Sequence, residues 1–597
     1  MKNIQILLLI SVLFFTSCEE VLDKEPLDII SDAAVWSDPV LIDDYLNQCY
    51  AEMVFAWETQ YGGTPRYMPT GLYTWFEQVH SITIADEASF GWVPAPKSHW
   101  ISIGGGIMEW WGYPTVRKLN IFLENMDPMD LEAGYKTSRM AEARFLRAFC
   151  YFNMVKRYGG VPLITRVQQL DDPDEELYRF RDKEADIYDF ILTEIDDIVD
   201  DLPDRWEGTD YGRASKYAAL ALKSRAAMYA GSIASWGEVA LNEVVGIPQS
   251  KASGYWQASY DASREIITKG GFSLYNAHAN KTTNFRNLFL DEGNGESIFS
   301  EQFDGLSGKG HSYDMWMNPW GHHVWGAGQQ GAVNLEMVES FEYIDGRAGI
   351  IDRDKIAAGH AWTVDELFGN KDPRFKASVY THGSSWKSGQ VRLDYHIGTE
   401  TPEGVTNVGS YKGVLCATPT AVTPFGVLKY LDEAERAFVM ERNHSDTDYM
   451  VFRLGEVLLN YAEAAIELGK DGDALWAINE IRKRAGMPTY QAISRDLVRK
   501  ERKVELAFEG NRFWDLRRWR IAKEELSHVF HGLRFVLDGS SYEEGAYNVL
   551  TAKYKLTIQD NIDGIPAPYF DTKHYYLPIG LGRTANNSNL VENPGYQ

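Results

Sequence analysis

The chain has 597 residues, of which 44% are hydrophobic and 24% are charged, enough for a sizeable core in one large domain or two closely packed ones. It carries 59 lysines and arginines against 85 aspartates and glutamates, a formal charge of −26 that argues against nucleic acid and other anionic polymers as partners. Aromatic residues make up 13%, including 18 Trp and 33 Tyr. So many aromatic rings must fill a core, an interface or a binding surface.

The N-terminal residues predict export and lipid attachment. Lys2 precedes an apolar run over 4–15, which suits a secretory signal and is too short to span a membrane as a helix. Two small residues stand before Cys18, as in the lipobox of bacterial lipoproteins. We therefore predict a signal peptide over 1–17 and acyl chains on Cys18 that hold the mature chain to a membrane. The alternative is an ordinary signal peptide with an incidental cysteine.

Helical periodicity dominates the remaining sequence. Apolar residues recur at helical spacing from Glu142 to Tyr158, and Gly159 and Gly160 end that helix. Further helices are expected over 187–202, 214–234, 260–267, 449–468 and 474–485. Small residues on their packing faces suggest tetratricopeptide-like antiparallel hairpins, although no clean 34-residue period can be aligned.

Two stretches, 57–100 and 311–326, are rich in aromatic residues but lack helical spacing. Glycine and proline interrupt both, so we predict long loops that fold onto the body or await a ligand. A sugar ring stacks its apolar C–H face on an indole, and polar side chains bond its hydroxyls. The candidate contacts are Arg66, Tyr73, Trp75, Asp86, Trp92, Trp316, Asn318, Trp320 and Trp325. The alternative for each Trp is a buried role beneath its loop.

Glu501, Glu505 and Glu509 are spaced four apart and therefore share one helical face. Such stacked carboxylates could serve acid–base chemistry or bind a cation. Apolar residues are interleaved so densely, however, that the segment must lie against the core, where charges persist only when paired. We predict a structural network of glutamates and arginines, with local candidates Arg502, Arg512, Arg517 and Arg518.

No metal or cofactor site is predicted. Cys49, Cys150 and Cys416 are too far apart in the chain for a zinc spacing and are interpreted as small buried residues. His322 and His323 are adjacent and therefore point in different directions, without a carboxylate at a recognisable spacing. The sequence contains no P-loop, no GxSxG element and no HExxH element.

Several stretches resemble hallmark sequences of the SusD/RagB family, the glycan-binding outer-membrane lipoproteins of Bacteroidetes. They are 143–149 with 158–163, 453–464, 502–519 and 593–596. With the lipobox, they extend over nearly the whole chain in the family's order. The resemblance implies a mainly α-helical, SusD-like fold in which tetratricopeptide-like hairpins support an irregular, loop-rich ligand-binding part. We expect one domain over 18–597, with an N-terminal part at about 18–235 and a C-terminal part at about 255–597.

The resemblance also implies a function. The protein would be a surface lipoprotein of the outer membrane that binds an oligosaccharide or polysaccharide, catalyses nothing, needs no cofactor, and delivers its ligand to a TonB-dependent, SusC-like barrel. Glu19 and Glu20 resemble the acidic signals that send such lipoproteins to the cell surface. One alternative is a peptide-capturing lipoprotein of the same fold. Another is an exported glycoside hydrolase, in which Asp86 or Asp314 would have to serve as a catalytic carboxylate.

Overall fold

A computed structural model of the chain describes most of its residues. The described ranges are 35–53, 55, 80–90, 108–319, 331–386, 391–402, 404–407, 423–433, 444–541, 547–563 and 569–596. Helices make up 48% of the structure, which confirms the mainly α-helical prediction. No helix within these ranges is long and apolar enough to cross a membrane.

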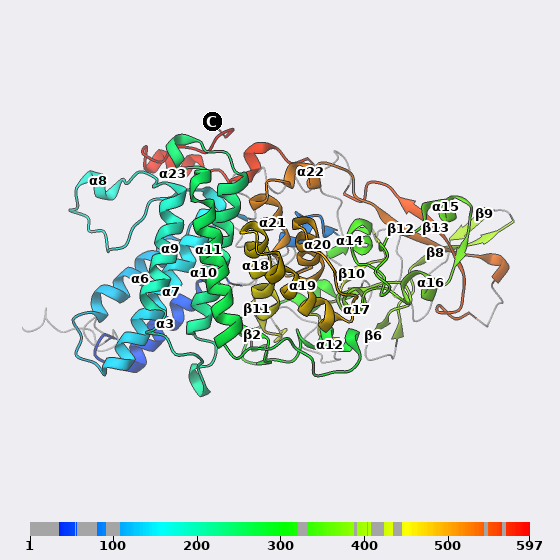
Figure 1. Cartoon of the computed structure of the whole chain (residues 1–597), viewed down its shortest axis with the longest axis horizontal. Coiled ribbons are helices and arrows are strands. Elements are labelled where there is room, and N and C mark those ends of the chain that lie inside the picture. The colour runs from blue at the N-terminus through cyan, green and yellow to red at the C-terminus, as the bar shows by residue number, and fades with distance from the viewer. Residues whose placement is uncertain are drawn as a thin grey trace, which may run out of the picture.

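The longer helices form a row in which each packs against a helix close to it in the chain (Figure 1). They are α3 (Pro39–Ala51), α6 (Tyr113–Met126), α7 (Ala133–Tyr158), α9 (Glu184–Ile198), α10 (Lys216–Trp236), α11 (Ala252–Lys269), α18 (Leu454–Glu467), α19 (Asp471–Ala485) and α20 (Arg495–Glu505). Antiparallel pairs such as α10 with α11 and α18 with α19 correspond to the predicted hairpins.

The end of α7 shows why two consecutive glycines follow it. Gly159 adopts a positive φ of 77°, a conformation that costs other residues free energy. A Cβ on Gly160 would lie only 1.9 Å from the backbone oxygen of Asp182. The two glycines therefore end the helix and allow the backbone at Asp182 to pass directly beside Gly160.

One predicted helix begins later than expected. Residues Tyr449–Arg453 form strand β11, which pairs antiparallel with β2 (Ser297–Glu301), and α18 starts only at Leu454. All five residues of β11 are buried, so their apolar character does not distinguish strand from helix. Pairing with a strand about 150 residues earlier decides the conformation.

A five-stranded sheet lies at the end of the molecule away from α6 and α7 (Figure 1). Its strands, in spatial order, are β4 (Ala361–Trp362), β13 (Tyr554–Gln559), β12 (Gly532–Leu537), β8 (His396–Thr401) and β9 (Gly404–Asn407). A separate hairpin joins β6 (Ser385–Trp386) to β7 (Val391–Arg392).

Short helices connect these parts. They are α4 (His80–Thr83), α8 (Asp174–Leu177), α12 (Lys281–Asn287), α13 (Tyr313–Met317), α14 (Leu335–Ser340), α15 (Arg353–Ala357), α16 (Val364–Phe368), α17 (Pro373–Ser378), α21 (Arg512–Arg518), α22 (Ala522–Leu526) and α23 (Leu581–Asn586). One continuous hydrophobic core runs through the described residues of both expected parts, 18–235 and 255–597.

Candidate functional site

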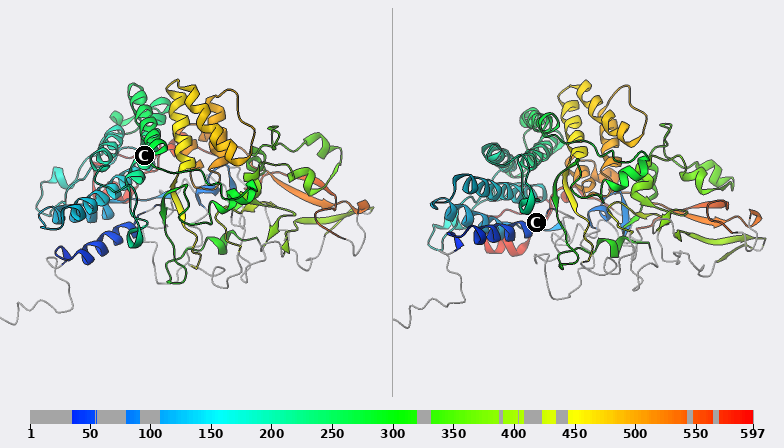
Figure 2. Two further views of the ribbon diagram at one scale, coloured as in Figure 1. Left: turned by 60° about the horizontal axis from the view of Figure 1, so that its bottom comes forward. Right: turned by 90° about the horizontal axis from the view of Figure 1, so that it is seen from below.

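A small antiparallel sheet lies on the side of the molecule away from α11, α18 and α19 (Figure 2). Its strands, in spatial order, are β1 (Ala88–Phe90), β3 (Gly331–Val333), β10 (Gly426–Val427) and β5 (Val379–Tyr380). Phe90 pairs with Gly331, and Gly426 pairs with Ala332 on one side and Tyr380 on the other. The sheet thus joins segments that are far apart in the sequence.

Close contacts fix helix α13 to this sheet. The Tyr380 ring lies across Gly426, where a Cβ would come within 2.0 Å of the ring carbon Cζ, so only glycine fits there. The Tyr380 hydroxyl donates a hydrogen bond to the backbone oxygen of Met317, at 2.9 Å. The Tyr313 hydroxyl donates to the backbone oxygen of Lys429, at 3.0 Å. Helix α13 is therefore held at two points.

The sheet is also the attachment point of the predicted aromatic loops. Trp92 follows Phe90 by two residues, and Trp320 and Trp325 precede Gly331 in the chain. Because Phe90 and Gly331 are paired, the last residue before the stretch 91–107 and the first residue after the stretch 320–330 are neighbours in the sheet. The structure brings together the bases of two stretches that the sequence separates by more than two hundred residues.

Three of the predicted ligand contacts lie inside the protein. Asp86, Trp316 and Asn318 are 3%, 5% and 1% exposed. The Asn318 side-chain amide donates to the backbone oxygens of Asp314 and Met315, at 2.9 Å each, and so closes the end of α13. These side chains hold the frame in the structure, and we leave them out of the ligand contacts proposed below.

Asp86 is held by two cations from the stretch 502–519. Its carboxylate accepts hydrogen bonds from Arg512, at 2.8 and 2.9 Å, and from Lys503, at 2.8 Å. Burial alone would raise the pKa of Asp86, but the charges of Arg512 and Lys503 outweigh it and hold that pKa well below its usual range. Asp86 therefore anchors the segment before β1 to helices α20 and α21.

Glu87, the next residue, is buried without such a partner. One of its carboxyl oxygens accepts a hydrogen bond from the backbone N–H of Phe508, at 2.7 Å, and the other has no hydrogen-bond partner. Burial raises the pKa of Glu87 to about 8. The carboxyl is therefore mostly protonated at neutral pH and links β1 to the turn after α20.

The other predicted site residues lie outside the described ranges. They are Arg66, Tyr73, Trp75, Trp92, Trp320 and Trp325, together with the lipidation candidate Cys18.

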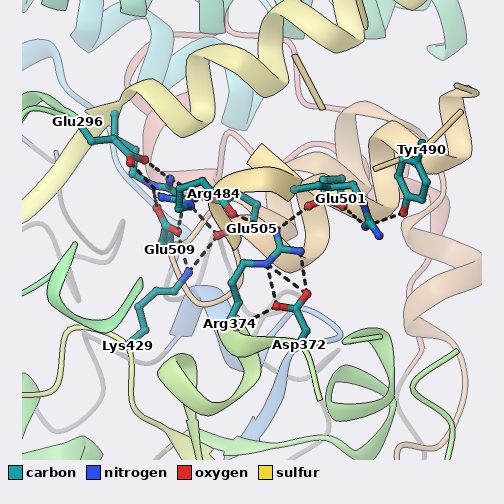
Figure 3. A network of polar contacts seen from close by, with 11 residues as sticks. Glu296, Asp372, Arg374, Lys429, Arg484, Tyr490, Glu501, Glu505 and Glu509 are labelled. Atoms are coloured by element: carbon teal, nitrogen blue, oxygen red, sulfur yellow. Dashed lines mark hydrogen bonds and ion pairs between the residues drawn. The ribbon is translucent and has the colours of Figure 1, made fainter. Parts of the chain in front are cut away.

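A buried ion network fastens the sheet to the helical row (Figure 3). It consists of Glu296, Asp372, Arg374, Lys429, Arg453, Arg482, Arg484, Glu501, Glu505 and Glu509. At its centre, Glu505 contacts Arg453 at 2.8 Å, Arg374 at 3.0 Å, and Arg484. Arg374 lies in α17 just before β5, and Lys429 follows β10 by two residues. The network thus connects both strands to α18, α19 and α20.

This geometry confirms that the three glutamates are paired, but Glu509 lies in the turn after α20 and not on the predicted helical face, and the predicted local partners are wrong. Arg502 contacts Asp515 at 2.8 Å, and Arg518 contacts Glu463 at 2.5 Å. Arg512 binds Asp86, and Arg517 makes no ion pair with a described residue. The actual partners come from other elements. The three glutamates face the elements that are packed against them, and the local arginines do not reach that side.

Sequence reasoning missed Arg374, Lys429 and Tyr380. For Arg374 a signal was present, since Asp372 followed by Pro373 is a typical helix start, and Asp372 indeed caps α17. For Lys429 and Tyr380 there was none, because strands of two residues are too short to show alternation.

The described residues offer few other candidate binding sites. Within the described ranges, no group of three or more His, Cys, Asp or Glu side chains could hold a metal ion. An open pocket of about 350 Å³ lies apart from the sheet, at the start of α6. Its lining includes Trp111, Tyr113, Arg117, Arg166 and Arg179.

Comparison with known proteins identifies the family. A model of the SusD family matches residues 295–596, more than half of the chain. The chain belongs to the SusD family. A second model, described as starch-binding and associating with the outer membrane, matches residues 99–228. SusD-family glycan-binding proteins are non-catalytic, in agreement with the expectation that this protein is not an enzyme.

Similar proteins cover nearly the whole chain. A SusD-like protein of Formosa agariphila is 25% identical over 556 residues, which cover 88% of this chain and 93% of the relative. The starch-binding protein SusD of Bacteroides thetaiotaomicron is 23% identical, over 89% of this chain and 84% of the relative.

Solved structures show the same fold. A SusD-like protein of Bacteroides fragilis superimposes with a TM-score of 0.68 at 24% identity, covering 96% of this chain and all of the other. Surface glycan-binding protein A of Bacteroides thetaiotaomicron, solved with laminarihexaose, gives a TM-score of 0.56 at 18% identity, covering 92% of this chain and 98% of the other. These likenesses confirm the predicted SusD-like fold.

Proposed function

We propose that this protein captures an oligosaccharide or polysaccharide at the cell surface, through aromatic side chains on the loops that start from the small sheet. The observation that carries the proposal is the pairing of Phe90 with Gly331, because the stretch 91–107 follows the first of these residues in the chain and the stretch 320–330 precedes the second. The proposed contacts are Trp92, Trp320 and Trp325 on these loops, together with Arg66, Tyr73 and Trp75 from the earlier stretch 56–79. Stacked indoles next to polar groups suit the two faces of a sugar ring.

A rigid base supports this function. The ion network and the Tyr380 contact hold β5, β10 and α13 in place before any ligand arrives. Binding sites on rigid elements lose less conformational entropy when a ligand binds. Relatives named for starch and for laminarin binding make a neutral glucan the first ligand to test.

The hydrolase alternative has less support. Asp86 is held by Arg512 and Lys503, and Asp314 is 1% exposed with its Oδ1 bonded to the backbone N–H of Asp432. Neither carboxylate faces an open cleft in the described structure, as an acid–base pair would need to. The peptide-capturing alternative uses the same fold and is distinguished only by its ligand.

Binding to starch-derived and laminarin-derived oligosaccharides, measured by isothermal titration calorimetry, tests the proposal. We expect Trp92→Ala and Trp320→Ala each to weaken binding at least about tenfold, because each removes a stacking surface. Trp476→Ala is the matched control, since Trp476 is 46% exposed on α19, in the helical row, and should leave affinity unchanged.

Two results would contradict the proposal. Binding of peptides with no binding of any glycan on an array would favour the peptide-capturing alternative. Equal affinity losses in Trp476→Ala and Trp92→Ala would place the ligand elsewhere.

We further propose that the protein is anchored in the outer membrane through Cys18 and passes its ligand to a TonB-dependent, SusC-like barrel. A tether keeps captured glycan at high effective concentration beside the pore, whereas a diffusing protein would carry it away. Cys18→Ala should release the protein from membranes and impair growth on the glycan, with glycan affinity of the purified protein unchanged. Normal growth with fully released protein would show that the anchor is dispensable for uptake.

A further inference from the structure

Three cations surround one buried indole where two of the family-like stretches meet. Lys156 and Arg157, at the end of α7, lie 4.7 and 5.1 Å from the ring centroid of Trp514 in α21. Arg517, one helical turn further along α21, lies 4.9 Å from the same ring. We call these four residues the Trp514 cluster. All four are at most 7% exposed, so their charges are largely removed from water.

Arg517 is the member that the protein leaves unsatisfied. Its Nη2 donates to the backbone oxygen of Tyr575, at 2.6 Å, and its plane packs near Phe513 and Trp514. Its Nε and Nη1 are buried and have no hydrogen-bond partner, and no described carboxylate lies within ion-pair distance. A buried guanidinium in this state destabilises the fold unless something else accepts a hydrogen bond from it.

Nearby arginines show that the fold can satisfy such groups. Arg181, also buried, donates to the backbone oxygens of Gly160, Val591 and Tyr158 at 2.6–2.7 Å. Arg157 donates to the backbone oxygens of Met108 and Asn153, at 2.8 Å each. Arg517 has only one such acceptor.

The surroundings of Arg517 hold one further cation, a neutral histidine and a carboxylate. Arg520 donates to the backbone oxygen of Arg517, at 3.1 Å, and to the Tyr576 hydroxyl, at 2.7 Å. His574 accepts from the backbone N–H of Asp571 through Nδ1, so Nε2 carries its proton, and Nε2 is buried without a partner. Glu184, a buried carboxylate on this side, accepts from Tyr576 and from the backbone N–H of Gly246.

We propose that a small inorganic anion, chloride or a tetrahedral oxyanion such as sulfate or phosphate, binds at Arg517 in the folded protein. Nε and Nη1 lie on opposite edges of the guanidinium, so the anion occupies one edge and accepts the free N–H there. Lys156, Arg157 and Arg520 supply positive potential that favours a negative ion over water. The ion joins the end of α7 to α21 and so stabilises the contact between the two family-like stretches.

Anomalous diffraction tests the site directly. Crystals of the wild-type protein grown in bromide should show an anomalous peak in hydrogen-bonding contact with Nε or Nη1 of Arg517. A water or a protein group at both edges, with no bromide, would overturn the proposal.

Thermal unfolding tests whether the ion matters in solution. At constant ionic strength set with gluconate, increasing chloride, bromide, sulfate or phosphate should raise Tm by about 2–4 °C for at least one of these anions, because it binds only the folded state. Arg517→Met should abolish this response. Arg499→Met is the matched control, since Arg499 also stacks on two indoles, Trp236 and Trp519, and should keep it.

A bromide peak without any anion-dependent change in Tm would mark an adventitious ion only and would overturn the proposal. The same holds if Arg517→Met and wild type respond equally. Because the diffraction experiment uses wild-type protein, poor folding of the variant does not leave the proposal untested.

Discussion

In the ion network around Glu505, each arginine contacts at least one carboxylate, whereas in the Trp514 cluster Arg517 contacts none in the described structure. Arg453 alone bonds Glu296, Glu505 and Glu509, all at 2.8 Å. Both regions are buried and both contain family-like residues. Burial of a charge therefore does not reveal its role, because the surroundings determine whether the charge holds the fold together or leaves a site open.

Breaking the ion network should have the largest effect. Glu505→Gln removes the carboxylate shared by Arg374, Arg453 and Arg484 and leaves their charges under-compensated in the core. We expect the free energy of unfolding, measured by urea denaturation, to fall by about 3–5 kcal/mol.

The control for this substitution is an exposed ion pair. Glu480→Gln breaks the contact with Lys483 on the surface of α19 and should change the free energy of unfolding by less than about 0.5 kcal/mol. Similar losses in both variants would contradict the view that Glu505 organises the core.

Glu87 is a third case, a buried acid that forms no ion pair with a described residue. Its pKa is about 8 in the folded protein against an ordinary value of 4.5, so folding takes up a proton between these values. The protein should therefore lose stability from this group as pH rises from about 4.5 to 8. Glu87→Gln keeps the bond from Phe508 and should raise the free energy of unfolding at pH 8 by on the order of 1–3 kcal/mol.

Urea denaturation at several pH values checks this expectation. Relative to wild type, Glu87→Gln should flatten the decline between pH 4.5 and 8, while Glu480→Gln should not. An unchanged slope in Glu87→Gln would mean that the carboxyl ionises normally in the folded protein.

The smallest effect is expected at Arg517. Arg517→Met leaves no carboxylate behind, and the lost stacking on Phe513 and Trp514 offsets the removal of an unsatisfied charge, so the free energy of unfolding in gluconate, where no coordinating anion is present, should change by less than about 1 kcal/mol. Arg453→Met, which takes one cation from each of three buried glutamates, should cost about 3–5 kcal/mol under the same conditions. Equal losses would remove the distinction between the two regions.

The sequence by itself determined the helical row and the family. Apolar periodicity over 142–158 and the two glycines after it predicted where α7 ends, because helix formation and termination are local. The spacing of Glu501, Glu505 and Glu509 predicted paired charges, because three carboxylates on one buried face cannot remain alone. The predicted ligand-binding aromatics remain predictions, since most of them lie outside the described residues.

Only the tertiary structure decided which charges meet and where the loops start. Arg374 lies more than 120 residues before Glu501 and Glu505, and no local pattern encodes a partner at that distance. Strands of two or three residues, such as β10 and β1, gain their stability from pairing and show no period of their own. Asp86 looked like a ligand contact in the sequence, and only its position between Arg512 and Lys503 showed that it anchors the frame.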